Sequence, residues 1–127
     1  MKTILLIEPD KILAQTQQRY LERKDYKVVW RQTAESAVMA LDEASVDVVI
    51  LELNLAVHNG VEFLYEMRSY SEWQNIPVIL HTNVRKGQLA EDALARLNIA
   101  DYLYKPSTTL AELVQSIEKI LQPALTT

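Results

Sequence analysis

The hydrophobic pattern of the chain alternates between short apolar runs and longer amphipathic segments. Five short segments rich in Val, Ile, Leu and aromatic residues predict strands. Between and after them the apolar residues recur at helical spacing, which predicts five helices. The expected strands cover residues 3–7, 27–31, 46–51, 77–80 and 102–104, and the expected helices cover residues 11–24, 34–44, 61–70, 87–98 and 108–121.

Strict alternation of strand and helix predicts an α/β fold, a doubly wound five-stranded parallel sheet with helices on both faces. Asp10 and Thr33 are placed to cap the first two helices, and Pro123 ends the last one. The pattern therefore predicts one domain over residues 1–122 and a short C-terminal tail over residues 123–127.

Composition narrows the classes of protein. The chain has 127 residues, of which 49% are hydrophobic and 24% charged, as expected for one soluble globular domain. A net charge of −4 without a cluster of Lys and Arg argues against direct nucleic-acid binding. With no cysteine, no apolar segment long enough for a bilayer and no signal-peptide pattern, a cytoplasmic location is expected.

Polar residues with chemical potential follow four of the predicted strands. Glu8 and Glu52 each come directly after a strand, Thr82 follows the fourth strand, and Lys105 follows the fifth. Because the carboxyl ends of parallel strands meet at one edge of a sheet, these side chains are expected to converge. Carboxylates can hold a hard cation, while an ammonium and a hydroxyl can hold an anion. The pattern therefore predicts a phosphoryl-handling site.

The segments that carry these residues resemble the signature segments of bacterial response-regulator receiver domains. They are residues 5–10, 48–53, 77–82 and 101–106, and the resemblance covers essentially the whole chain. Gly60 follows Glu52 by 60 − 52 = 8 residues and Thr82 follows it by 82 − 52 = 30, two intervals that fit the family. The resemblance implies a flavodoxin-like receiver fold and a role in two-component signal transduction.

The resemblance also implies roles for individual residues. Glu52 stands at the phosphoacceptor position, Thr82 at the switch hydroxyl, Lys105 at the lysine that contacts the phosphoryl group, and Tyr102 at the switch aromatic. The metal ligands implied by the family pattern are Glu8, Glu52 and the backbone carbonyl of Asn54.

Departures from the family pattern weaken the implied phosphotransfer. The family has an aspartate where this chain has Glu52, an acid where it has Pro9, and a loop proline where it has Ala56. The extra methylene of glutamate displaces the carboxylate, and a misplacement of about 1 Å can cost roughly 100-fold in rate. Losing an acid weakens a Mg²⁺ site. We therefore expect no enzymatic activity, no required cofactor, and Mg²⁺ binding that is weak at most.

The leading hypothesis is a pseudo-receiver that signals by protein–protein interaction, independently of phosphorylation, with Glu52 reaching Lys105 and Thr82. One alternative is a working response regulator that a histidine kinase still phosphorylates at Glu52 or a nearby acid. In another, Glu52 only forms a structural ion pair. A flavin or nucleotide site is disfavoured, because the first loop lacks glycine.

The expected partner is a histidine kinase or a downstream output protein, and a homodimer is also compatible with the pattern. In the family the usual contact face is formed by the fourth helix, the fifth strand and the fifth helix. In this chain that face includes Gln88, Glu91, Asp92, Arg96, Tyr104 and parts of residues 110–120. Its mixed charges do not identify the partner.

Overall fold

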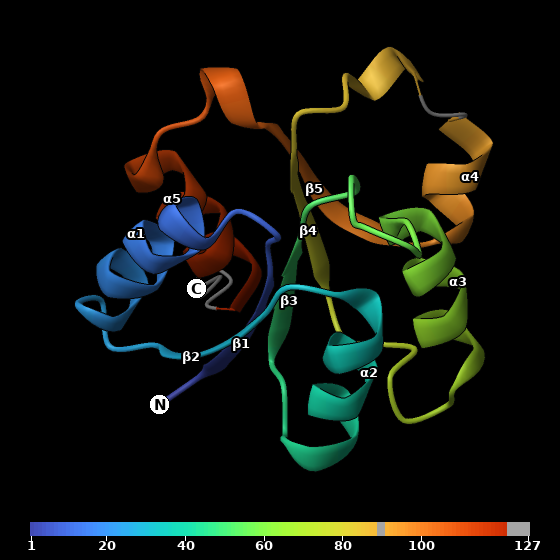
Figure 1. Ribbon diagram of the computed structural model, residues 1–127, viewed down its shortest axis with the longest axis horizontal. Coiled ribbons are helices and arrows are strands. Elements are labelled where there is room, and N and C mark those ends of the chain that lie inside the picture. Colours follow the sequence, from blue (N-terminus) through green and yellow to red (C-terminus); the bar gives the residue numbers. More distant parts are fainter. Residues whose placement is uncertain (89–90, 122–127) are drawn as a thin grey trace, which may run out of the picture.

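The computed structural model describes residues 1–88 and 91–121, so the predicted tail at 123–127 lies outside the described residues. Within these residues, five strands and five α-helices alternate (Figure 1). The strands are β1 (Thr3–Ile7), β2 (Lys27–Arg31), β3 (Val48–Leu51), β4 (Val78–Thr82) and β5 (Ile99–Tyr104). The helices are α1 (Lys11–Glu22), α2 (Ala34–Glu43), α3 (Gly60–Ser69), α4 (Glu91–Arg96) and α5 (Leu110–Leu121). Two short 3₁₀ turns lie at Lys86–Gln88 and Lys105–Ser107.

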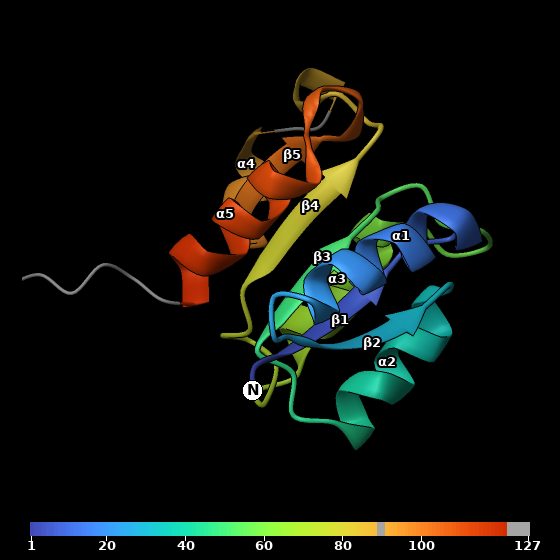
Figure 2. The same cartoon turned by 90° about the vertical axis from the view of Figure 1, so that its left-hand side faces the viewer.

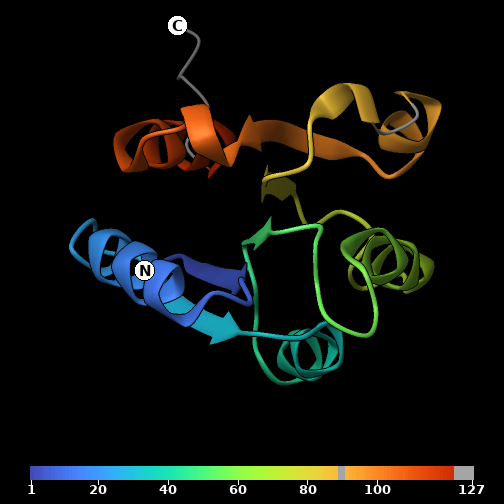
Figure 3. The same cartoon turned by 45° about the horizontal axis from the view of Figure 1, so that its top comes forward.

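All strand pairs are parallel, and the strand order is β2-β1-β3-β4-β5. Helices α1 and α5 cover one face of the sheet, and α2, α3 and α4 cover the other (Figures 1 and 3). The expected doubly wound α/β fold is confirmed. The order reverses between β1 and β3, where such folds place their ligands, beyond the carboxyl ends of the strands.

Two apolar layers hold the sheet between the helices. On the α1–α5 side, shown facing the viewer in Figure 2, Ile4, Ile50 and Ile79 of the strands pack against Leu21 and Ile117. On the opposite side, alternate strand residues pack against α2 and α3, with Phe63 and Met67 almost fully buried. Since both faces are covered, the central strands are apolar along most of their length, which explains why they appear as nearly continuous runs in the sequence.

Helix starts follow the expected capping chemistry. Asp10 accepts hydrogen bonds from the backbone N–H groups of Ile12 and Leu13, and Thr33 accepts one from Ser36. Both predicted caps are confirmed. The Asp10 side chain therefore binds the start of α1 and does not point its carboxylate into the site beside it.

Some element boundaries differ from the sequence prediction. The helix expected over residues 87–98 is a 3₁₀ turn at Lys86–Gln88 followed by the short α4, with residues 89–90 outside the described part. Strand β5 begins three residues before the expected position 102, at Ile99. The polar Asp101 interrupts the apolar pattern, so the sequence did not predict this part of the strand. In the structure Asp101 accepts a hydrogen bond from the Ser116 hydroxyl of α5, with 2.6 Å between the oxygens.

Candidate functional site

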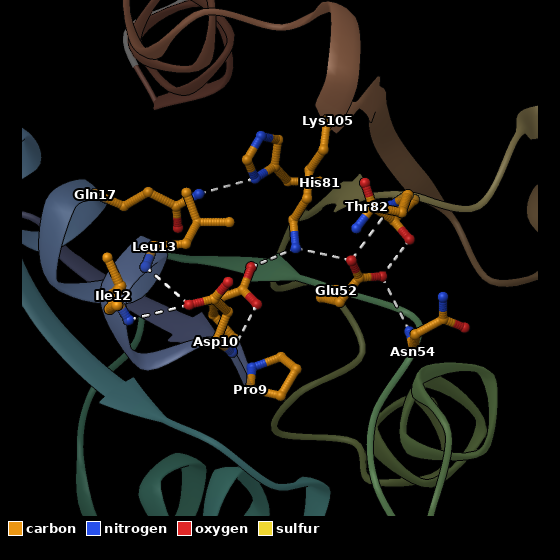
Figure 4. Close-up of polar contacts among 12 residues, drawn as sticks. Pro9, Asp10, Ile12, Leu13, Gln17, Glu52, Asn54, His81, Thr82 and Lys105 are labelled. Carbon is orange, nitrogen blue, oxygen red and sulfur yellow. Dashed lines mark hydrogen bonds and ion pairs between the residues drawn. The ribbon is translucent and has the colours of Figure 1, made fainter.

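Four polar side chains meet at the carboxyl edge of the sheet (Figure 4). Glu8 follows β1, Glu52 follows β3, Thr82 ends β4, and Lys105 follows β5. Strands β1, β3, β4 and β5 are neighbours in that order, so residues far apart in the sequence become adjacent. Glu8, Glu52 and Thr82 are 0–2% exposed, although they are polar or charged.

Lys105 lies between the two glutamates. Its Nζ is 2.5 Å from Glu8 Oε1 and 2.8 Å from Glu52 Oε1, and its side chain is 9% exposed. One buried ammonium thus serves two buried carboxylates. Such an arrangement is tolerated in an interior only when the remaining carboxylate oxygens also find donors.

Glu52 meets that requirement on both carboxylate oxygens. Oε2 accepts hydrogen bonds from the Thr82 hydroxyl and from the backbone N–H of Asn54, at 2.9 Å for the latter. Oε1 accepts one from the backbone N–H of Asn83, at 3.2 Å, beside its bond to Lys105. Burial alone would raise the pKa of Glu52, but the bonds from Lys105, Thr82 and Asn54 outweigh it and hold the pKa below its usual value.

Glu8 has fewer donors. Its Oε2 accepts a hydrogen bond from the backbone N–H of Asp10 at 3.1 Å, and its Oε1 is bound to Lys105. Burial raises the pKa of Glu8, and these two donors and the charge of Lys105 do not fully offset it. The two glutamates are therefore unequal, and Glu52 is the more firmly ionised of the two.

The residues present do not fit the divalent cation that the resemblance implies. Glu8 and Glu52 each give an oxygen to the Lys105 ammonium, Pro9 has no carboxylate, and the Asp10 side chain caps α1. Within residues 1–88 and 91–121, no group of three or more His, Asp or Glu side chains is arranged to hold a metal ion. The lysine ammonium is the cation of this site.

Tyr102 and Thr82 fix the loop that leaves β4. The Thr82 hydroxyl accepts a hydrogen bond from the backbone N–H of Val84 at 3.1 Å, and the Tyr102 hydroxyl donates to the Val84 carbonyl at 2.5 Å. The next residue, Arg85, lies over the ring of Tyr104, 5.2 Å from its centroid. Two predicted site residues thus hold one short segment from both sides.

Gly60 allows the chain to return close to Glu52. Its backbone N–H donates to the Leu53 carbonyl at 2.8 Å, and a Cβ at this position would lie 2.8 Å from the Leu53 Cα. No side chain fits there without a shift. The sequence places Gly60 at an interval from Glu52 that fits the family, but only the structure shows this close contact with the residues that follow β3.

A buried polar pair adjoins the site, and the sequence did not reveal its glutamine member. Gln17 Nε2 on α1 and His81 Nδ1 on β4 are 3.1 Å apart, and the two side chains are 0% and 6% exposed. Burial, with the nearby Lys105 charge, lowers the pKa of His81 to about 4. The available signal was a glutamine at an otherwise apolar helical position.

Comparison with known proteins identifies relatives along nearly the whole chain. The family model described as the response regulator receiver domain matches residues 4–118. The transcriptional regulatory protein CpxR of Klebsiella pneumoniae is 32% identical over 96% of this chain and 50% of its own. QseB of Haemophilus influenzae is 32% identical over 94% of this chain and 52% of its own. The chain spans about half the length of these curated relatives.

Solved structures show the same fold. A two-component response regulator from Clostridium difficile superposes with a TM-score of 0.86 at 23% identity, covering 99% of this chain and 100% of that one. The Mn²⁺-bound form of response regulator Rcp1 superposes with a TM-score of 0.79 at 24% identity, covering 100% and 99%. The match of the family model over residues 4–118 shows that the chain belongs to the response regulator receiver domain family.

Proposed function

We propose that this receiver domain signals through protein contacts in a conformation held by Glu52, without phosphorylation. One observation carries the proposal: the Glu52 carboxylate receives hydrogen bonds from Thr82, Lys105, Asn54 and Asn83. Thr82 and Lys105 are the two side chains that the family pattern assigns to a phosphoryl group. Here they bind a carboxylate that belongs to the chain.

The same bonds leave Glu52 a poor nucleophile. Both of its oxygens are occupied and its pKa is lowered, so attack on a phosphoryl donor requires breaking contacts that ionisation has strengthened. Lys105 is also bound to Glu8, at 2.5 Å. The site therefore offers a phosphoryl donor no free carboxylate, and the two acids that would hold a divalent cation are both bound to Lys105.

Hydrogen bonds connect Glu52 to the loop after β4, which lies near the surface. Asn83 binds Glu52 directly, and Val84 is held by Thr82 and Tyr102. This loop leads into α4, so the position of Glu52 bears on the α4–β5–α5 face. The exposed residues there include Gln88, Glu91, Asp92 and Arg96. We propose this face as the contact with a histidine kinase or an output protein in the cytoplasm.

Within the described residues, no helix has the length and apolar character that crossing a membrane requires. The names of the two relatives describe transcriptional regulators, each about twice the length of this chain. We propose that any output of this domain comes from a partner or from further sequence, and that the domain itself catalyses no reaction.

Intact-mass spectrometry tests the proposal. The protein and its Glu52→Asp variant are incubated with Mg²⁺ and a small acyl-phosphate donor, and their masses are compared. We expect no phosphoryl group on the native protein, because the Glu52 carboxylate is fully bonded. A phosphorylated native protein would establish the alternative, a working response regulator, and peptide mapping would locate the acceptor. Phosphorylation of Glu52→Asp alone would show that Glu52 silences an otherwise competent site.

A structural readout accompanies the mass measurement. Amide NMR spectra of the native protein and of Glu52→Gln are compared over the loop after β4 and over α4. Glutamine keeps the size of the side chain but loses the charge that binds Lys105. We expect shifts at Asn83, Val84 and the residues of α4. Unchanged spectra in these segments would show that Glu52 does not hold the signalling face.

A further inference from the structure

Charge is divided unequally between two parts of the chain. Residues 32–67 contain seven Asp and Glu and no Lys or Arg, whereas residues 11–31 contain six Lys and Arg against two Asp and Glu. The acidic segment supplies α2 and α3, and the basic segment supplies α1 and β2. Because α1 lies on the opposite face of the sheet from α2 and α3 (Figure 3), the basic helix and the two acidic helices lie on opposite sides of the sheet.

An apolar groove with an acidic rim runs between α2 and α3. It has a volume of about 510 Å³, and its lining includes Val38, Met39 and Phe63 together with Glu35, Glu62 and Glu66. His58 lies between two of the rim acids, 3.6 Å from Glu35 and 3.3 Å from Glu62. The described residues that line it include no Lys or Arg. Such a groove fits a helix that carries an apolar side chain and basic residues.

Helix α1 carries these features on its exposed side. Ile12 is 78% exposed, a high value for a large aliphatic residue. Arg19 follows it by seven residues, two helical turns away on the same stripe, and Arg23 follows at the end of the helix. Arg19 and Arg23 are spaced by four residues, as are Glu62 and Glu66 of the groove, so each pair spans about 6 Å along its helix.

We propose that α1 of one copy docks into the α2–α3 groove of a second copy, with Ile12 in the groove. The arginines of α1 then face the glutamates of α3. Since the two surfaces are different and lie on opposite faces of the molecule, the contact is head-to-tail, and repeated contacts form a ring or an open chain. The contact is distinct from the α4–β5–α5 face and does not depend on Glu52.

Sedimentation equilibrium tests the proposal with the protein itself. We expect the weight-average mass to rise above the 14.6 kDa of one chain as concentration increases. The rise is expected to shrink with added salt, because the screening length falls from about 10 Å at 0.1 M to about 3 Å at 1 M. A protein that stays monomeric at every concentration and salt level overturns the proposal.

Two variants separate the two surfaces. Ile12→Glu places a negative charge on the helix that docks, and Met39→Lys places a positive charge in the groove; both positions are exposed, at 78% and 61%, so folding is preserved. Each variant alone is expected to be monomeric. An equal mixture is expected to associate again, to a mass above the 14.6 kDa of one chain, because each variant supplies the surface that the other lacks.

The mixture distinguishes this contact from others. A mixture that stays monomeric, or an Ile12→Glu protein that associates like the native one, overturns the head-to-tail arrangement. Tyr65→Ser is the control, since Tyr65 is an exposed aromatic residue of α3 outside the groove lining. It is expected to associate like the native protein, and its loss of association would place the contact elsewhere on α3.

Discussion

Lys105 places one buried ammonium between two buried carboxylates. It neutralises one of two glutamates that are almost fully buried, and the surrounding N–H and O–H groups satisfy the rest of their oxygens. A buried charge network of this kind depends on every member, since losing one partner strands the others in a site of low dielectric constant.

Replacing Lys105 by methionine should destabilise the fold in a pH-dependent way. At neutral pH we expect a loss of about 3–5 kcal/mol in the free energy of unfolding, because two buried carboxylates lose their counter-charge. Without the ammonium, the pKa values of both glutamates rise. As pH is lowered, the folded variant therefore binds protons before the unfolded chain does, and its stability falls as pH rises. The difference in unfolding free energy between the native protein and the variant then shrinks toward about pH 4.

Urea unfolding of Lys105→Met at several pH values measures this deficit. Lys119→Met is the control, because Lys119 lies exposed on α5 and should change stability by no more than about 0.5 kcal/mol. A deficit that is the same at pH 4 and pH 7 would contradict the role given to the ammonium.

Gly60 permits a close backbone approach beside the site. In Gly60→Ala, the new methyl group would lie 2.8 Å from the Leu53 Cα and 3.1 Å from the Glu52 carbonyl oxygen. We expect a loss of about 1–3 kcal/mol in thermal or urea unfolding, as for other overpacked positions. Gly87→Ala provides the comparison, since nothing lies within 4 Å of its new methyl group. Equal stabilities for the two variants would disprove the steric explanation.

At the residue scale, the sequence predicted which side chains lie in the site better than it predicted their bonds. Glu8, Glu52, Thr82 and Lys105 follow strands, and parallel strands bring such positions together. The division of Lys105 between two glutamates could not be predicted. It depends on distances between four separate strand ends, and on the Asp10 side chain being occupied by the helix cap.

At the scale of elements, α1 and β4 are joined by the Gln17–His81 pair across a covered face of the sheet. Among the described side chains, Gln17 Oε1 is the one buried oxygen without a hydrogen-bond partner. Leu13 and Leu110 help to line a cavity of about 400 Å³ beside this pair. The pair therefore links a helix to the strand that carries Thr82, within a largely apolar layer.

The His81 imidazole should make stability fall in mild acid. Its pKa is lowered to about 4 in the folded protein, so between pH 6.5 and about 4 the unfolded chain binds a proton that the folded protein does not. Stability is thus lost as pH falls through this window, by about 3 kcal/mol in total. Urea unfolding from pH 7 to pH 4 should show that loss for the native protein.

The double variant Gln17→Leu with His81→Leu should lose this component of the pH dependence. Removing both partners leaves no new unpaired group, which makes the double variant a fairer test than either single change. His58→Gln is the control, because it removes the other histidine, which is exposed, and should retain the decline. A double variant that loses as much stability in acid as the native protein would contradict the assignment.

The strength of the hydrophobic pattern decided which elements the sequence could predict. The strands at the centre of the sheet are mostly apolar, and the sequence located them to within two residues. The region from residue 87 to residue 101 was less clear, because Ala and Leu spacing favours one helix while α4 has six residues. Among the described strands, β5 lies at the edge of the sheet beside β4 and tolerates the polar Asp101.

At the scale of the whole molecule, added Mg²⁺ should not stabilise the fold. A ligand that binds only the folded protein raises the unfolding free energy by mass action, and Lys105 already occupies the carboxylates of Glu8 and Glu52. We expect the same thermal midpoint in Mg²⁺ and in EDTA. The variant Pro9→Asp with Glu52→Asp restores the family's acids and should be stabilised by Mg²⁺. A midpoint of the native protein that rises with Mg²⁺ would contradict the assignment.

The four hydrogen bonds to Glu52 also affect how long a signal carried by this domain lasts. An aspartyl phosphate is an acyl phosphate, which water hydrolyses, so a signal stored in one decays. A glutamate side chain has no such decay, and the contacts it makes with Thr82 and Lys105 persist as long as the polypeptide does. In a cell, the duration of a signal carried by this domain would then be set by synthesis and degradation of the chain, and its strength by the number of copies.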